Sequence, residues 1–198
     1  EIRKETVALR NDAIEEMAER VIELGRAYAI WWELCERKNF ELHEKLIRDH
    51  LDFFGTVAHS LFQGFFIISA QLFDKRRDTK SFPRIAAILS SSNPTLASSI
   101  QSRILAEQPR LRKVFSVRHN LYAHRNHLQS PQSVFAQVSL TPREMKAVVA
   151  LAEDIMCDLM ADAGLQKKSE FRERVRSRQF YAREDTKRIM SALKRHAI

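Results

Sequence analysis

Residues 53–73 read "FFGTVAHSLFQGFFIISAQLF" and contain no Asp, Glu, Lys or Arg. Apolar side chains recur at every third or fourth position of this stretch, at Phe54, Ala58, Leu61, Phe65, Ile68 and Leu72. This spacing predicts a helix with a continuous apolar side. The stretch is long enough to cross a bilayer, but polar residues interrupt it, among them His59, Ser60, Gln63 and Gln71. We therefore expect the central helix of a soluble bundle, with no membrane association.

The rest of the chain is also expected to be helical. Its 198 residues include only 4 Gly and 5 Pro, which favours helices over tightly turned sheet. Periodicity predicts helices over about 4–38, 41–73, 82–90, 95–107, 109–127 and from 141 onward. The run "VFAQVSL" at 134–140 is expected to be a short extended piece. The predicted fold class is an all-α antiparallel helical bundle with an additional basic C-terminal helix.

Local signals place several of the helix ends. Ser81 is suited to cap a short helix, and Thr141-Pro142-Arg143-Glu144 has the spacing of a capping box. Gly164 is a candidate C-cap. Trp31 and Trp32 are expected to close the core rather than to bind a ligand.

Charge divides the chain into a bundle, residues 1–166, and a C-terminal extension, residues 167–198. The extension holds 11 Lys or Arg and 4 Asp or Glu, whereas residues 1–166 hold 22 Lys or Arg and 21 Asp or Glu. A basic helix of this kind attracts polyanions, so four of its arginines are candidate nucleic-acid contacts, Arg172, Arg174, Arg176 and Arg178. A solvated helix needed for packing or dimerisation is the alternative.

The chain has two cysteines, Cys35 and Cys157, and no CxxC motif. Widely spaced single cysteines do not indicate a disulfide framework. We expect reduced, buried thiols in a cytoplasmic protein.

A candidate catalytic stretch is "RHNLYAH", residues 118–124. Composition alone predicts roughly two Arg-x4–6-His matches in a chain like this one, and three are present, so spacing carries no weight. Context separates Arg118 and His124 from the other two pairs, which are Arg37 with His43 and Arg112 with His119. His119 follows the arginine, Ala123 leaves room beside the histidine, and a helix end is expected within a few residues.

Helical geometry separates Arg118 from His124. Six residues of an α-helix leave the two side chains about 120° apart, so the helix must end or loosen near Ala123 to bring them together. Asn120 lies four residues before His124 and is expected to orient it. Tyr122 lies four residues after Arg118, where it would pack on the arginine or face a substrate.

This stretch resembles the Arg-polar-x4-His signature of HEPN domains, all-α proteins many of which are metal-independent RNases of phage-defence and toxin systems. The wider sequence, "FFIISAQLFDKRRDTKSFPRIAAIL" at 65–89 followed by "VRHNLYAHRNH" at 117–127, resembles the AbiU-type abortive-infection branch. The likeness spans about Leu42 to Leu159 and leaves the basic C-terminal helix outside.

The resemblance implies a homodimer in which the Arg-to-His helices of two subunits form one composite cleft. It implies that Arg118 holds the scissile phosphate, that His124 acts as general acid or base, and that His119 orients the phosphate or the histidine. RNA would be the substrate, with Arg125 as a further contact, and an antitoxin protein is a possible partner. No cofactor or metal is implied.

The same residue types fit metal-independent RNA cleavage on chemical grounds. The reaction needs a group that moves protons and a cation that stabilises the charge growing on phosphate. Histidine and arginine supply these two functions near neutral pH. The alternative is an inactive HEPN-type module that binds a partner protein or nucleic acid.

Three further possibilities concern nearby residues. A zinc site at His119, His124 and His127 has little support, because no Cys, Asp or Glu lies beside them. Asp74 and Asp78 would either join the cleft or pair with the neighbouring cations. No Ser-His-Asp arrangement or HExxH motif indicates another hydrolase.

Overall fold

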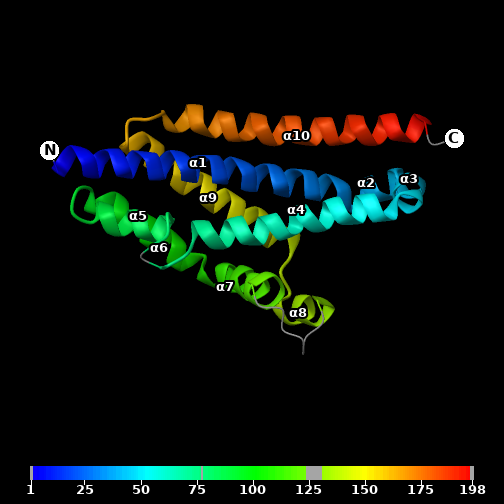
Figure 1. Ribbon diagram of the computed structural model, residues 1–198, viewed down its shortest axis with the longest axis horizontal. Helices are drawn as coiled ribbons and strands as arrows, with labels where there is room; N and C mark the ends of the chain where they lie inside the picture. The colour runs from blue at the N-terminus through cyan, green and yellow to red at the C-terminus, as the bar shows by residue number, and fades with distance from the viewer. Residues whose placement is uncertain (1, 77, 124–130, 197–198) are drawn as a thin grey trace.

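The predicted central helix is α4, Leu51–Leu72, in the computed structural model of the chain, which describes residues 2–76, 78–123 and 131–196. It packs against α1, Ile2–Cys35, and the two run antiparallel (Figure 1). On the other side of α1 lies α10, Lys168–His196, and α9, Pro142–Asp162, contacts all three (Figure 1). Within the described ranges the regular structure is helical, without a strand, which confirms the all-α helical bundle.

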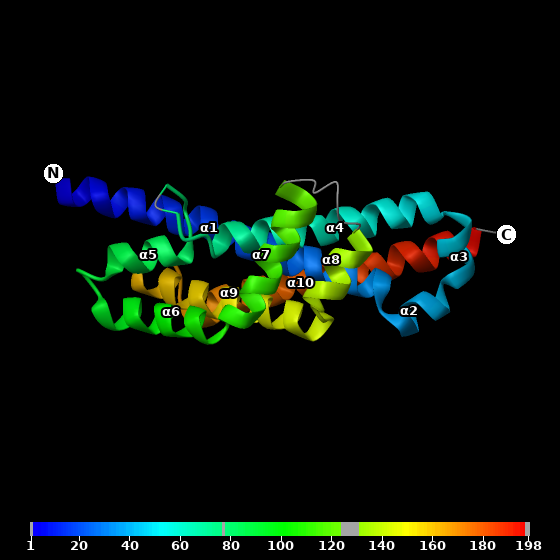
Figure 2. The ribbon, with the colours of Figure 1, turned by 90° about the horizontal axis from the view of Figure 1, so that it is seen from below.

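The remaining elements are shorter. They are α2 (Arg37–Leu42), α3 (Glu44–Asp49), α5 (Phe82–Leu89), α6 (Pro94–Ala106), α7 (Gln108–Val117), a π-helical turn η1 (Arg118–Ala123) and α8 (Pro131–Val138). Figure 2 shows α5 and α6 beside α9 at one end of the molecule, with α7 crossing the C-terminal half of α4.

The core follows the periodicity of α1 and α4. Phe65 and Leu72 of α4 are buried against Met17 and Leu24 of α1. Burial of each such side chain stabilises the fold by about 1.5–3 kcal/mol. Trp31 lies at the edge of this core, where its ring stacks on Phe62 with centroids 5.2 Å apart.

By length and hydropathy, α4 meets the requirements for a membrane-spanning helix. The core helix of a globular protein meets the same requirements, and 33% of the residues in its most apolar window are buried. The composition of α4 therefore does not distinguish these two roles.

The single helix predicted over 41–73 is wrong, because the chain breaks at His43 and again at His50. Both residues leave the helical region, with φ −120° and ψ 18° at His43 and φ −126° and ψ 41° at His50. Together with the extended residue Glu36 after α1, these two bends reverse the chain between α1 and α4. They also bury Leu46 and Ile47 in a small second core with Phe54.

Two of the predicted caps are confirmed. Ser81 Oγ accepts a hydrogen bond from Arg84 N at 3.4 Å at the start of α5. Thr141 and Glu144 form the reciprocal capping box of α9, with Glu144 N donating to Thr141 Oγ1 at 3.2 Å and Thr141 N donating to Glu144 Oε2 at 2.8 Å. These bonds satisfy two backbone donors that a helix start otherwise leaves unpaired.

The end of α9 is a Schellman motif. Gly164 has φ +69° and follows the C-cap. Its N–H donates to Ala161 O at 3.1 Å, and Leu165 N donates to Met160 O at 3.0 Å. The predicted role of Gly164 at this helix end is confirmed.

The extended piece predicted over 134–140 is wrong, because residues 131–138 form α8. Pro131 lies at the first position of this helix, where the missing N–H costs nothing and the fixed φ is already helical. Val134 of α8 is buried, which shows that tertiary packing stabilises the short helix.

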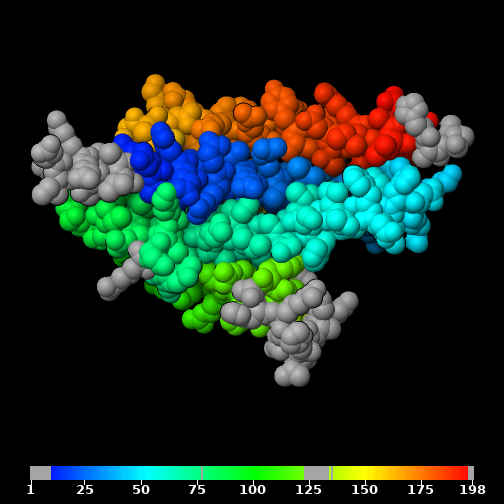
Figure 3. Space-filling model, in the orientation of Figure 1, coloured from blue at the N-terminus to red at the C-terminus, as the bar shows by residue number. Residues whose placement is uncertain are grey.

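The basic segment 167–198 shares the core of residues 1–166. Phe171 and Val175 of α10 are buried in the main core, and Met190 lies in the small second core. Figure 3 shows α10 as one continuous edge of the molecule along α1.

One of the two thiols differs from the expectation. Cys157 is buried in α9, and this burial raises the pKa of its thiol. Cys35 is exposed because α1 ends there and the chain turns into α2.

Candidate functional site

The predicted catalytic stretch begins where α7 becomes the π-helical turn η1. Val114 and Val117 of α7 are buried, whereas Arg118 and His119 are exposed. A π-helix closes its hydrogen bonds from i to i+5, and such turns are frequent at functional sites. The sequence predicts that the helix ends or loosens near Ala123. In the structure the α-helix changes to a π-helix earlier, at Arg118.

Arg118 lines a hollow of about 370 Å³. The other walls are the middle of α1, the last turns of α4, the segment that connects α4 to α5, and Phe115 of α7. Seven charged side chains line it, Glu16, Arg20, Asp74, Arg76, Asp78, Lys80 and Arg118. The structure therefore brings Arg118 together with the segment that the resemblance singled out.

Most of these charges pair with one another. Glu16 contacts both Arg20 and Lys80, and the hydrogen bond from Lys80 holds the pKa of Glu16 below its ordinary value. Asp74 accepts hydrogen bonds from Arg76, from N at 2.9 Å and from Nε at 3.0 Å. Asp74 pairs with a neighbouring cation, as one alternative predicted, and it also lines the hollow beside Arg118. Its place in a composite cleft stays a prediction.

Hydrogen bonds shape the connecting segment. Ser81 Oγ donates to Asp74 O at 2.6 Å, and Thr79 Oγ1 donates to Arg76 O at 2.9 Å. These bonds join the two ends of the segment and fix where the hollow opens. Thr79 and Asp78 both lie on its wall.

Arg118 differs from the other cations of this hollow. Among the residues that the structure describes, no carboxylate lies within 4.0 Å of its guanidinium, whereas Arg20, Arg76 and Lys80 each contact one. An arginine that is exposed and makes no ion pair keeps its forked donors available for an oxyanion.

Asn120 Nδ2 donates a hydrogen bond to Ser116 Oγ at 3.3 Å. One donor of the amide is therefore used within the same helix. The predicted partner, His124, lies outside the described residues, as do Arg125 and His127, so their predicted roles stay predictions. In the described ranges no group of three or more His, Cys, Asp or Glu is close enough to hold a metal ion.

Tyr122 packs against α4. Its ring stacks on Phe66, with centroids 6.1 Å apart, and lies edge-on to His59 at 6.1 Å. Burial raises the pKa of its hydroxyl. Tyr122 therefore anchors η1 to the bundle.

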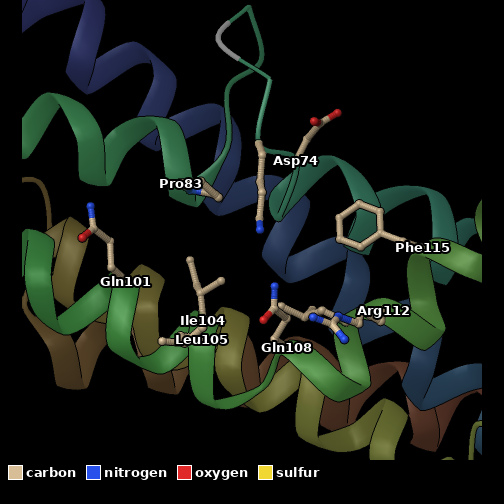
Figure 4. A pocket seen from close by; sticks show the side chains of 10 residues that line it. Asp74, Pro83, Gln101, Ile104, Leu105, Gln108, Arg112 and Phe115 are labelled. Carbon is tan, nitrogen blue, oxygen red and sulfur yellow. The ribbon is translucent and has the colours of Figure 1, made fainter.

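A second, larger hollow of about 600 Å³ adjoins the first and shares Asp74 and Phe115 with it. Its walls come from α5, α6 and α7 (Figure 4). Sequence reasoning did not identify this hollow, because no local motif marks side chains contributed by three separate helices.

The candidate arginines of α10 are partly engaged. Arg172 Nη2 lies 2.7 Å from Asp154 Oδ1, and Arg174 contacts Glu19 of α1. Arg176 Nε lies 4.0 Å from a Glu153 oxygen. Arg178 is exposed and, in the described part of the chain, has no carboxylate within 4.0 Å. The basicity of α10 thus serves packing on α1 and α9 as well as any external polyanion.

A scan of protein-family models, a search of curated proteins and a search of solved structures each returned no match to this chain.

Proposed function

We propose that this chain is a metal-independent endoribonuclease of the HEPN type that acts in the cytoplasm as a homodimer, in a phage-defence or toxin system. The observation that carries the proposal is the placement of Arg118. It is exposed on a π-helical turn, it lines a hollow, and no carboxylate among the described residues lies within 4.0 Å of it.

Arg118 would hold the scissile phosphate of a bound RNA. Its guanidinium can fork onto two phosphate oxygens. The same contact stabilises the negative charge that grows on those oxygens in the transition state. The wall formed by Phe115 limits the directions from which the phosphate can approach.

In the reaction, the 2′-oxygen bonds to phosphorus and the 5′-oxygen leaves. The 2′-hydroxyl proton passes to a histidine, and the leaving oxygen takes a proton from a second histidine. We assign these steps to His124 of the two subunits, with His119 orienting the phosphate. The products are a 2′,3′-cyclic phosphate and a 5′-hydroxyl.

The C-terminal helix would add salt-sensitive affinity for the RNA backbone, because each phosphate contact releases counterions. Arg178 is the strongest candidate, since the guanidinium groups of Arg172, Arg174 and Arg176 already contact acidic side chains. Arg125 would add a contact close to the catalytic histidine.

A second candidate is a non-catalytic module that binds a partner protein, such as an antitoxin. The observation that favours it is the presence of three carboxylates in the Arg118 hollow, Glu16, Asp74 and Asp78. Carboxylates beside a phosphate site weaken RNA binding through like-charge repulsion. A partner that presents both signs of charge fits such a surface.

The test is cleavage of mixed single-stranded RNA in EDTA by the purified chain. Wild type is expected to produce cyclic-phosphate ends, and Arg118→Gln is expected to cut at least about 100-fold more slowly because the phosphate loses its cation. His124→Ala should lose activity similarly. Arg84→Gln, which changes an exposed arginine outside the hollow, is the matched control and should cut normally.

Intact RNA with wild type, or equal cleavage by wild type and Arg118→Gln, would contradict the nuclease. Retention of a partner protein without cleavage would favour the second candidate. Size-exclusion chromatography with light scattering tests the homodimer directly.

A further inference from the structure

The 600 Å³ hollow beside the Arg118 site is mostly apolar. Pro83, Ile104 and Leu111 line it together with the ring of Phe115. Figure 4 shows the carboxylate of Asp74 pointing away from this space, and that carboxylate is held by Arg76. The hollow therefore offers apolar walls and an aromatic ring without an acidic group directed into it.

Two amide side chains face the same space. Gln101 of α6 and Gln108 of α7 lie on opposite sides of Ile104 (Figure 4). Neither side chain makes a hydrogen bond within the described part of the chain. A carboxamide without a partner at an apolar surface is suited to read the polar edge of a flat heterocycle.

Cations without acidic partners surround this hollow. Lys75 and Arg112 line it and are exposed, and within the described ranges no carboxylate lies within 4.0 Å of either. Arg118 lies beyond Phe115 in the adjoining hollow. Unpaired cations on both sides of an aromatic ring match the alternation of phosphates and bases along a single strand.

We propose that this hollow is a base-binding subsite that accepts one unstacked purine of single-stranded RNA, next to the phosphate held by Arg118. The inference rests on the proposed function for the role of Arg118. The purine would contact Phe115, and the Gln101 and Gln108 amides would hydrogen-bond to its edge. Lys75 and Arg112 would contact the flanking phosphates.

The chemistry of the lining side chains favours a purine. The volume lies in the usual range for pockets that bind small organic ligands. Glutamine forms bidentate hydrogen bonds with adenine, and arginine does so with guanine. A base within a duplex cannot enter because it remains stacked, so the subsite selects single-stranded or looped RNA.

The experiment measures binding rather than cleavage. The probes are 2′-O-methyl oligonucleotides of about 12 nucleotides, all uridine or with one central A, G or C, titrated by fluorescence anisotropy in EDTA. The methyl group blocks attack by the 2′-oxygen. One central purine is expected to strengthen binding about tenfold over uridine or cytidine.

Two substitutions should remove this preference. Gln108→Leu takes away an amide, and Ile104→Trp fills the hollow, so both should bind all four oligonucleotides with similar affinity. Gln137→Leu, at an exposed glutamine of α8, should keep the preference. Arg118→Gln should weaken binding to all oligonucleotides while the purine preference remains.

Equal affinity of wild type for purine and pyrimidine probes would overturn the subsite. Loss of the preference in Gln137→Leu would also overturn it. If wild type never cuts unmodified RNA but still prefers purines, the nuclease fails and the subsite stands. If wild type cuts unmodified RNA but shows no base preference in the cleavage assay or in the binding assay, the subsite fails and the nuclease stands.

Discussion

Arg103 Nη2 on α6 lies 2.6 Å from Asp158 Oδ2 on α9. The second oxygen of the same carboxylate lies 2.5 Å from Lys168 Nζ, at the start of α10. Asp158 therefore joins three helices at the end of the bundle opposite the α1–α4 turn. Charge-assisted hydrogen bonds of this kind are about twice as strong as neutral ones.

Replacing this carboxylate should lower stability. We expect Asp158→Asn to reduce the free energy of unfolding by about 1–2 kcal/mol, because both cations lose their charged acceptor. Asp154→Asn is the matched control, since Asp154 on the same helix pairs with Arg172 but is 54% exposed. Its effect should stay within about 0.5 kcal/mol. Urea titrations of the two variants measure the difference, and equal effects would contradict the special role of Asp158.

The contribution of Asp158 should depend on pH. Burial by itself raises the pKa of this carboxyl, but hydrogen bonds from Lys168 and Arg103 outweigh it and hold the pKa below its ordinary value. A lowered pKa gives stability that is present above the unfolded-state pKa and is lost as the pH falls through the folded-state pKa. The stability gap between wild type and Asp158→Asn should be constant from pH 7 to 5 and shrink below about pH 4. A gap that widened on acidification would refute this assignment.

Replacement by alanine should change the stability of the fold in opposite directions at two glycines. Gly164 has φ +69°, and an added Cβ would meet nothing within 4 Å, so Gly164→Ala tests backbone strain alone. We expect it to destabilise the fold by about 1 kcal/mol. Gly55 lies inside α4 with equally open surroundings, and Gly55→Ala should stabilise the fold by about 0.5–1 kcal/mol. Thermal unfolding of both variants provides the check, and shifts of the same sign would contradict the argument.

Tyr122 should act through its ring and not through its hydroxyl. Tyr122→Phe keeps the stacking on Phe66, so stability should change by less than about 0.5 kcal/mol and RNA cleavage should be unaffected. Tyr122→Ala removes a half-buried ring and should cost about 2 kcal/mol. Denaturant unfolding together with the RNA assay separates the role of the ring from that of the hydroxyl. A Tyr122→Phe variant that is stable but inactive would show a chemical role for the hydroxyl.

The capping box of α9 should be worth about 1 kcal/mol. Thr141→Ala removes the acceptor for Glu144 N and should destabilise the fold by that amount. Thr56→Ala, at an exposed position inside α4, is the control and should be neutral or slightly stabilising. Circular dichroism melts of the pair test this, and an equal loss in both variants would argue against the cap.

The fold class and several helix ends could be predicted because their causes are local. The caps at Ser81 and Thr141 and the turn at Gly164 depend on hydrogen bonds within a few residues. The breaks at His43 and His50 could not be predicted in this way, because they are stabilised by Leu46 and Ile47 packing against residues far away in the chain. The same reason explains α8, where the burial of Val134 stabilises a helix in a run that was expected to be extended.

For the candidate site, the sequence by itself determined the residue types, an arginine with permanent charge and histidines that titrate near neutral pH. It also determined the helical periodicity that exposes Arg118 and buries Val117. Only the tertiary structure decided that Arg118 shares a hollow with Asp74 and Asp78, that the turn it begins is π-helical, and that Tyr122 is turned onto α4. Pairing and burial depend on which distant segments meet, and local periodicity does not contain that information.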